Sequence, residues 1–190
     1  MLEFSTKKPL VPARSHLQRT KGWEWSLGRC GILLPRRRGE DMPERSTDWI
    51  KQARRDLEAA RRMAQEAFFE WACFVSQQAA EKAVKAVFQK LGGLAWGHSV
   101  FELLRALQTK VKVGEEILDC ARTLDKFYVP ARYPNGFAAG SPFEYFTEKE
   151  AENALFCAGR IVEFCEGILA REGRAPEGPE KRSRTPRPGE

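Results

Sequence analysis

Apolar residues recur every three or four positions along most of the chain between residues 46 and 172, the spacing of one face of an α-helix. No segment alternates convincingly between apolar and polar residues, as a half-buried strand would. Because the connections between the long periodic segments are short, we expect an all-α fold, an antiparallel up-and-down helical bundle of about five helices. The predicted helices run over about 47–67, about 69–91, from Ser99, over about 114–128, and from Thr147.

Signals at the helix ends support these boundaries. Gly92-Gly93 follows the second predicted helix, where a glycine can take the left-handed conformation that ends a helix. Ser99-Val-Phe-Glu102 and Thr147-Glu-Lys-Glu150 both match the capping box, in which a hydroxyl and a carboxylate satisfy the first helix amides. Within the second helix, Glu81 and Lys85 lie one turn apart, and we expect them to form an exposed ion pair.

One stretch of twenty residues, 127–146, interrupts the helical pattern. It holds seven aromatic residues, three prolines and two glycines, with Arg132 and Glu144 as its only charges. Proline does not fit inside a helix, so the stretch is predicted to be one long aromatic loop. Long loops inside compact domains are usually functional or disordered, and this composition argues against disorder. We therefore expect a functional site at this loop.

The formal net charge of +6 belongs to the two ends of the chain. Residues 42–172 contain eighteen basic and nineteen acidic residues, so the expected domain is close to neutral. A near-neutral domain gives no support for a broad phosphate-binding face.

The two ends differ from the helical region in composition. Residues 1–45 are basic, contain several prolines and show no sustained period, and two interpretations of them stay open. They form a disordered arm, or the start of translation is mis-assigned and synthesis begins at Met42. Residues 173–190 are rich in proline, glycine and arginine and lack large apolar residues, so we expect a disordered tail.

The five cysteines include no Cys-x-x-Cys pair, and four of them lie within helical patterns. Free thiols are therefore expected, with no metal site and no cofactor. No apolar run approaches the roughly twenty residues that span a membrane, and the N-terminus has no signal-peptide core. These features predict a cytoplasmic protein.

Five segments occur in the order found in one family of helical domains. They are WIKQARRDL at 49–57, QQAAEKAVKA at 77–86, GHSVFELL at 97–104, YVPARYP at 128–134 and FEYFTEKEA at 143–151. Together they resemble the HEPN domain (higher eukaryotes and prokaryotes nucleotide-binding). The resemblance implies a helical bundle over residues 46–172, commonly a homodimer, often encoded beside a minimal nucleotidyltransferase as a toxin–antitoxin-like pair.

Some branches of this family are metal-independent ribonucleases that use an arginine and a histidine four to six residues apart. That motif is absent here. His98 is the only histidine of residues 46–172, residues 91–97 contain no arginine, and no histidine follows Arg132. No catalytic residue carries over, so we expect a non-catalytic protein that binds a nucleotide or RNA, a nucleotidyltransferase, or both.

The candidate ligand-binding residues are Arg132, Tyr133, Tyr128 and His98. Arg132 suits a forked contact to phosphate, and the two tyrosines suit stacking on a base. Alternatively, Arg132 ties the loop down by bonding backbone carbonyls or Glu144, while the tyrosines pack and donate their hydroxyls to loop carbonyls. His98 is either a general base or a helix-start residue that bonds to the backbone.

Two further functions stay open. The first is a ribonuclease whose active site is assembled across a dimer from Arg132 and His98. The second is a structural adaptor subunit whose loop only binds a partner protein.

Overall fold

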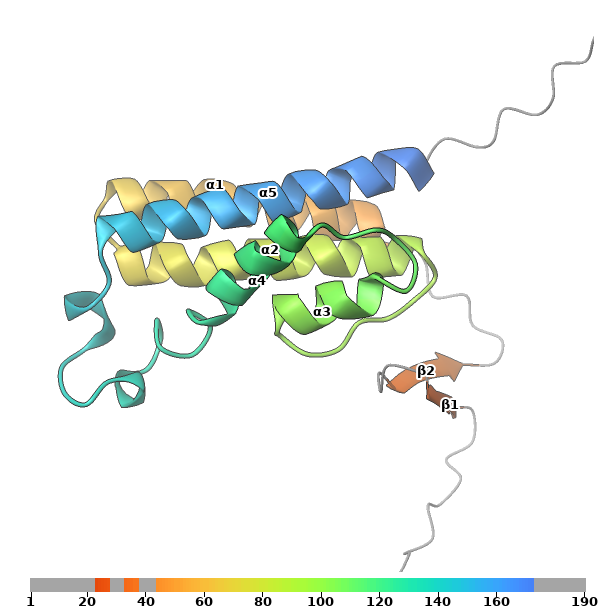
Figure 1. Cartoon of the computed structure of the whole chain (residues 1–190), viewed down its shortest axis with the longest axis horizontal. Helices are drawn as coiled ribbons and strands as arrows, with labels where there is room; N and C mark the ends of the chain where they lie inside the picture. Colours follow the sequence, from red (N-terminus) through yellow and green to blue (C-terminus); the bar gives the residue numbers. More distant parts are fainter. Residues whose placement is uncertain (1–22, 28–32, 38–43, 173–190) are drawn as a thin grey trace, which may run out of the picture.

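The computed structural model describes residues 44–172 and, for the backbone alone, residues 23–27 and 33–37. Residues 44–172 form five α-helices and two short 3₁₀ helices, η1 and η2, between the last two of them (Figure 1). The all-α helical bundle predicted from the sequence is confirmed. The elements are α1 Ser46–Gln65, α2 Phe69–Lys90, α3 Val100–Leu107, α4 Glu115–Asp125, η1 Pro134–Gly136, η2 Pro142–Glu144 and α5 Glu148–Glu172.

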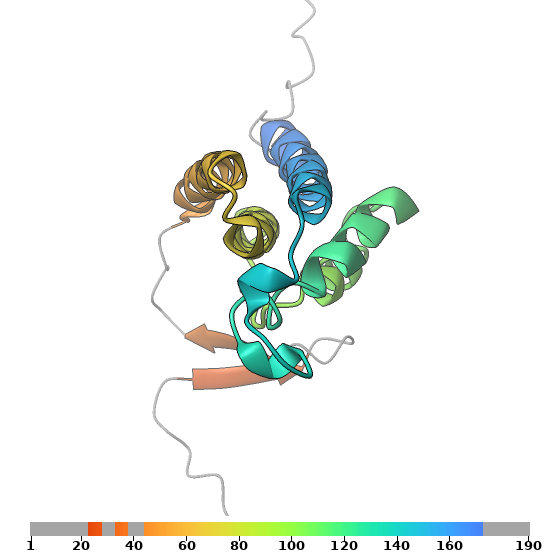
Figure 2. The ribbon, with the colours of Figure 1, turned by 90° about the vertical axis from the view of Figure 1, so that its left-hand side faces the viewer.

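Three long helices, α1, α2 and α5, each pack against the other two. Figure 2 views them close to their axes, with α3 and α4 lying to one side. A three-residue turn makes α1 and α2 antiparallel, whereas α5 runs in the same direction as α2 (Figure 1). The central element is α2, because it contacts each of the other four helices.

Small side chains allow the neighbouring helices to approach α2 closely. Larger apolar side chains from the surrounding helices fill the space between them, among them the fully buried Leu104, Leu124 and Ile161. The fully buried alanines of α2 are Ala72, Ala79, Ala80, Ala83 and Ala86.

The helices α1 and α2 end in the same way. In both, a residue with positive φ follows the helix, and the next amide bonds to the carbonyl five residues earlier at 2.8 Å. After α2 this residue is Gly92, with φ of 71°, so the predicted glycine stop is confirmed. After α1 it is Ala67, with φ of 60°, a conformation that a side chain disfavours. The first helix accordingly ends at Gln65, slightly before the predicted residue.

The two predicted capping boxes have different outcomes. At α5, the Thr147 hydroxyl accepts the Glu150 amide at 3.3 Å, and the Glu150 carboxylate accepts the Thr147 amide at 2.9 Å. At α3, Ser99 accepts the Glu102 amide at 3.1 Å, but the carboxylate that caps the helix belongs to Asp125. Asp125 can do this because α4 ends there, earlier than predicted, and brings it to the start of α3.

A short hairpin is the exception to the prediction that no segment forms a strand. β1 Trp23–Leu27 and β2 Leu33–Arg37 pair in antiparallel fashion, with Trp25 opposite Pro35. A proline inside a strand argues against regular pairing, because it cannot donate a hydrogen bond to the ladder. In a two-stranded ladder, however, each strand has only one paired edge, so a proline can face the unpaired side. The predicted tail at 173–190 and the rest of the N-terminal arm lie outside the described residues.

Candidate functional site

The guanidinium group of Arg132 lies over three aromatic rings. Its central carbon is 4.4 Å from the ring centroid of Tyr128, 4.6 Å from that of Phe74 and 5.0 Å from that of Tyr133. Its Nε also donates a hydrogen bond of 2.8 Å to the carbonyl oxygen of Tyr128. Contacts of this kind are individually modest, but together they fix the direction of the guanidinium.

Among the residues that the structure describes, no carboxylate lies within ion-pair distance of Arg132. Glu144, the partner considered from the sequence, accepts a hydrogen bond from the Ser141 amide at 2.6 Å instead. Of the two ties expected for Arg132, the one to a backbone carbonyl forms and the one to Glu144 does not. The contrast is Arg122, which bonds to both Glu115 and Asp119.

His98 contacts the same aromatic group from the segment between α2 and α3. Its ring stacks on Tyr128, with centroids 5.0 Å apart and planes 16° from parallel. Its Nδ1 lies 3.3 Å from both carboxylate oxygens of Glu81, and 58% of the side chain is exposed. The ring therefore faces a carboxylate and a tyrosine rather than a backbone group. The main-chain carbonyl of His98 accepts a hydrogen bond of 2.6 Å from the side chain of Gln77.

The prediction that Glu81 and Lys85 form an exposed pair was wrong. The pair exists, with 2.8 Å between the Lys85 Nζ and the Glu81 Oε1, but Glu81 is only 4% exposed. Because α2 lies at the centre of the bundle, the segment that carries His98 covers a face of α2 that would meet water in an outer helix. A buried carboxylate needs such partners, and Gln78 donates a further hydrogen bond of 3.2 Å.

The structure brings all four candidate residues to one place. Tyr128 touches both His98 and Arg132, so the distance between those two groups cannot exceed the sum of the two contacts. The proposed assembly of Arg132 and His98 across a dimer is therefore unnecessary, because a single chain brings them together. A tyrosine hydroxyl does bond to a loop carbonyl, but it belongs to Tyr145, which donates a hydrogen bond of 2.5 Å to the carbonyl oxygen of Ala139.

Two members of this cluster were missed from the sequence. Phe74 was not singled out, and Glu81 was assigned to the surface. A signal was present, because Phe74, Gln78, Glu81 and Lys85 follow one another by four, three and four residues and so share a face of α2. Only the packing of the loop on that face shows that these residues belong to the cluster around Arg132.

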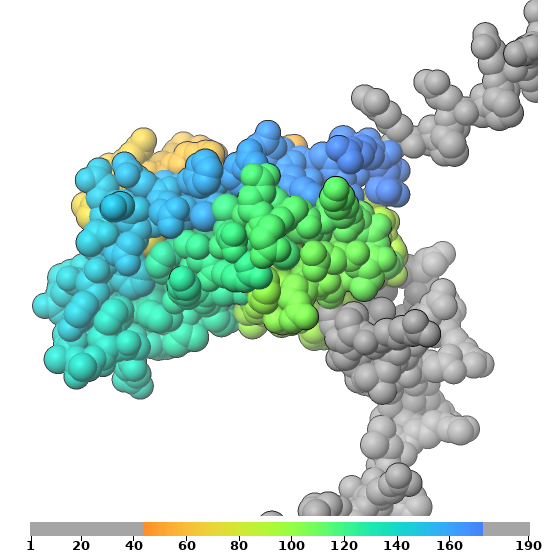
Figure 3. Space-filling model, in the orientation of Figure 1, coloured from red at the N-terminus to blue at the C-terminus, as the bar shows by residue number. Residues whose placement is uncertain are grey.

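The remainder of the aromatic loop is folded by its own side chains. Phe137 and Tyr145 stack with centroids 4.2 Å apart. Gly140 has φ of 78°, a left-handed conformation that a side chain disfavours, and a Cβ there would come within 2.9 Å of the Glu144 carboxylate. In Figure 3 this loop forms a continuous corner of the molecular surface below α5.

Exposed aromatic side chains extend the cluster along α2. Trp71 is 44% exposed and meets Phe74 edge-on at 6.2 Å, and Phe74 lies 6.2 Å from Tyr128. With Tyr133, which is 50% exposed, these rings give the Arg132 region an open aromatic face.

A family model described as HEPN domain matches residues 46–168. The chain belongs to the HEPN family. This result confirms the resemblance that the five sequence segments indicated, and it covers the whole helical bundle except the last residues of α5.

Two solved structures, one of them an archaeal HEPN homologue, and one curated protein are similar to this chain. TT1696 from Thermus thermophilus is 42% identical, with a TM-score of 0.65 over 66% of this chain and 99% of that protein. ST0689, an archaeal HEPN homologue, is 45% identical, with a TM-score of 0.57 over 65% of this chain and 97% of that one. MJ1304 of Methanocaldococcus jannaschii, named as a candidate toxin, is 28% identical over 64% of this chain and 86% of its own length.

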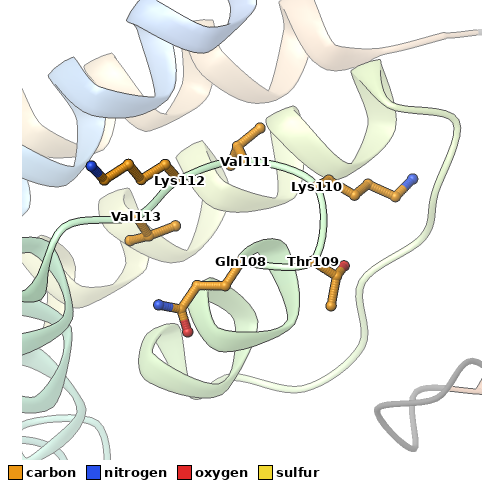
Figure 4. A pocket seen from close by; sticks show the side chains of 6 residues that line it. All are labelled: Gln108, Thr109, Lys110, Val111, Lys112 and Val113. Atoms are coloured by element: carbon orange, nitrogen blue, oxygen red, sulfur yellow. The ribbon is translucent and has the colours of Figure 1, made fainter.

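The HEPN domain also has an open cavity of about 430 Å³ lined by residues 108–113, between α3 and α4 (Figure 4). Its two lysines, Lys110 and Lys112, extend away from each other rather than converging. None of the candidate ligand-binding residues lines it. Within the described part of the chain, no helix is long and apolar enough to cross a membrane, and no three potential metal-ligating side chains form a cluster.

Proposed function

We propose that Arg132 and the rings around it bind a nucleotide or RNA, with the guanidinium on a phosphate and Tyr133 stacked on a base. One observation carries this proposal. Of the three guanidinium nitrogens of Arg132, only Nε has a hydrogen-bond acceptor within residues 44–172. That acceptor is the carbonyl oxygen of Tyr128. The two terminal nitrogens, which form a fork that matches phosphate oxygens, are left for a ligand.

The surroundings of Arg132 support binding rather than a purely structural role. Contacts with three rings hold the guanidinium in place before any ligand arrives, so little side-chain entropy remains to be lost on binding. Half of the Tyr133 side chain is exposed, and stacking on a base contributes about 1–3 kcal/mol per ring.

Binding is tested by titrating a labelled single-stranded RNA and a nucleoside triphosphate against the full chain, followed by fluorescence anisotropy and by melting temperature. Arg132→Ala is expected to weaken binding by about tenfold or more and to flatten its salt dependence, because a charged contact to phosphate is lost. Tyr133→Ala is expected to weaken binding with the salt dependence unchanged.

Arg122→Ala is the matched control. Arg122 also lies over an aromatic ring, 4.5 Å from the centroid of Phe101, but two carboxylates already bind it. An equal loss of affinity in Arg122→Ala, or no binding by the unaltered protein, would contradict the proposal.

The biological setting that we propose is a toxin–antitoxin-like module in which a nucleotidyltransferase is the partner. Membership of the HEPN family and the name of the M. jannaschii relative support this setting. Co-expression with the product of the neighbouring gene tests it, since a stable complex should co-elute in size-exclusion chromatography. The homodimer expected for this family would have a light-scattering mass of twice 21.6 kDa.

A second function, RNA cleavage, is favoured by the shared contact of His98 and Arg132 with Tyr128. If Nδ1 carries the proton toward Glu81, the Nε2 of His98 is left as an acceptor. His98 would then take the proton of a ribose 2′-hydroxyl, and Arg132 would stabilise the charge that develops on the phosphate.

Cleavage is separated from binding by incubating the protein with a mixed RNA pool. Loss of cleavage in both His98→Ala and Arg132→Ala, with cleavage kept in Arg122→Ala, would support this second function. RNA that is bound but stays intact would exclude it and leave the binding proposal standing.

A further inference from the structure

His98 has one ring nitrogen held by the protein and one without a protein partner. Nδ1 lies 3.3 Å from both carboxylate oxygens of Glu81, and an ionised carboxylate only accepts hydrogen bonds, so Nδ1 is the nitrogen that donates. Within residues 44–172, Nε2 forms no hydrogen bond, and 58% of the side chain is exposed. The buried Glu81 therefore holds the ring in place and leaves Nε2 for a ligand.

Arg132 shows the same combination of one bound and two unbound nitrogens. Tyr128 lies between it and His98, since its ring centroid is 4.4 Å from the guanidinium carbon and 5.0 Å from the imidazole centroid. The two groups are thus separated by no more than these two contacts placed end to end. A phosphate that makes hydrogen bonds of about 2.8 Å to both sides spans a gap of this size.

The charges around His98 are compatible with a cationic ring. From α2, the ring meets Glu81, which also pairs with Lys85 at 2.8 Å. From the end of α4, Tyr128 contributes an uncharged ring, and the carboxylate of Asp125 is bonded to the start of α3. Among the described residues, the charged group that pairs with the imidazole is therefore acidic, so a second proton on the ring meets no like charge there.

We propose that His98 and Arg132 together bind a terminal phosphate, the group found at a 5′-phosphorylated RNA end and on a free nucleotide. This inference rests on the binding function proposed for Arg132 and adds the class of phosphate. The fork of Arg132 engages two phosphate oxygens, and a phosphate inside an RNA strand has only two oxygens that are not bridging. A terminal phosphate has three, so one remains for the Nε2–H of protonated His98. It also carries almost two negative charges at neutral pH, which two cations balance.

This role of His98 is opposite to the one needed for RNA cleavage. A general base must accept a proton at Nε2, whereas a phosphate ligand must receive a hydrogen bond from it. Lowering the pH through the range in which histidine ordinarily gains its charge should therefore slow cleavage and strengthen the binding of a terminal phosphate.

The test compares two forms of one short RNA, labelled at the 3′ end and carrying either a 5′-phosphate or a 5′-hydroxyl, by fluorescence anisotropy with the full chain. We expect the phosphorylated form to bind about tenfold more tightly or better, because it gains a charge-assisted hydrogen bond. His98→Gln keeps a polar side chain without the charge and should lose most of this preference. Its affinity for the 5′-hydroxyl form should stay unchanged, whereas Arg132→Ala should weaken the binding of both forms.

The comparison of the two RNAs on the unaltered protein needs no variant, so it also holds if a variant does not fold. Equal affinity for both forms, with both weakened in Arg132→Ala, would overturn this inference and leave the function proposed for Arg132 standing. Absence of binding by either form would overturn both. An equal preference for the 5′-phosphate in His98→Gln and in the unaltered protein would exclude His98 from the site.

A pH series provides an independent measurement. Between about pH 8 and pH 6.5, histidine gains charge while a terminal phosphate keeps most of its second charge, so binding of the phosphorylated RNA should tighten. The change should be smaller in His98→Gln and for the 5′-hydroxyl RNA, and equal changes in both proteins would contradict the proposal.

The two sources of a terminal phosphate are separated by competition. Displacement of the labelled RNA by a nucleoside monophosphate would assign the site to free nucleotides. Displacement by unlabelled phosphorylated RNA alone would assign it to RNA ends. Displacement by the 5′-hydroxyl RNA as effective as by the phosphorylated RNA would overturn the proposal.

Discussion

Tyr128 and His98 stack almost in parallel, with ring centroids 5.0 Å apart, although α3 and α4 separate them in the chain. The contact that aligns them lies next to both residues. Asp125, at the end of α4, accepts a hydrogen bond of 2.7 Å from the hydroxyl of Ser99, the residue after His98. The Asp125 carboxylate, which caps α3, therefore also holds together the two segments whose rings stack at the candidate site.

Tyr128→Ala is expected to separate His98 from Arg132, because one ring contacts both side chains. In NMR spectra, the ring protons of His98 should move downfield once the tyrosine ring current is removed. Stability should fall by about 1–3 kcal/mol in urea unfolding. Tyr128→Phe keeps the ring and should preserve the His98 shifts, so a change as large as that of the alanine variant would contradict the stacking.

Asp125→Ala should destabilise the start of α3. The carboxylate accepts the amides of Val100 at 2.8 Å and Phe101 at 3.0 Å, and both lose their acceptor in the variant. We expect a loss of about 1–3 kcal/mol and faster hydrogen exchange at these two amides. Asp119→Ala is the control, since Asp119 is exposed and should leave their exchange rates unchanged.

Glu81→Gln is expected to destabilise the protein by about 2–4 kcal/mol, because the largely buried Lys85 loses its charge partner. The amide keeps the size of the side chain, so the effect reports on charge. Glu58→Gln removes an exposed carboxylate that pairs with two exposed arginines, and no measurable change is expected. Equal midpoints in urea for the two variants would show that burial does not strengthen the Glu81 pair.

Ala67→Gly should stabilise the protein by about 0.5–1 kcal/mol. Ala67 has φ of 60° at the position where α2 uses a glycine, and glycine adopts this conformation without steric cost. Ala64→Gly, inside α1, should instead destabilise by about 1 kcal/mol. Chemical denaturation of both variants measures the opposite signs, and destabilisation by Ala67→Gly would contradict the left-handed assignment.

Stability should decline at alkaline pH. Burial raises the pKa of Cys73 to about 12 from an ordinary value of 9.0, so this thiol stays protonated in the folded chain while it ionises in the unfolded one. The contribution of this thiol to the free energy of unfolding is complete below about pH 9. It is lost as pH rises toward 12, because unfolding in that range releases a proton. Cys73→Ala should therefore make the decline shallower by about 1.4 kcal/mol per pH unit in this window. Identical slopes of the free energy of unfolding against pH in the unaltered protein and in Cys73→Ala would contradict this prediction.

The helical fold was predictable because its determinants are local. The spacing of Ile50, Ala53 and Leu57, the glycines after α2 and the Thr147–Glu150 capping box all act within a few residues. The end of α4 was placed too late, because Tyr128 continues the apolar pattern beyond the helix. The hairpin was missed because Pro35 counts against a strand unless the pairing partner is known.

The candidate site was only partly predictable. Arg132, Tyr133, Tyr128 and His98 could be selected as residue types suited to binding, but their mutual contacts cross from one segment to another. Glu81 shows the limit most clearly, since its spacing from Lys85 is that of an ordinary surface pair. Nothing local to α2 indicates that the segment carrying His98 will cover it.

The sequence by itself determined the helices, their family and the loop in which to look, because periodicity, caps and prolines act over short distances. Tertiary structure alone decided that Arg132 has aromatic rings and no described carboxylate around it, and that His98 faces a buried glutamate. These relationships depend on how α2, α4, α5 and the loop pack together. Packing is fixed by the sum of many weak contacts across the whole domain, so no single segment of the sequence encodes it.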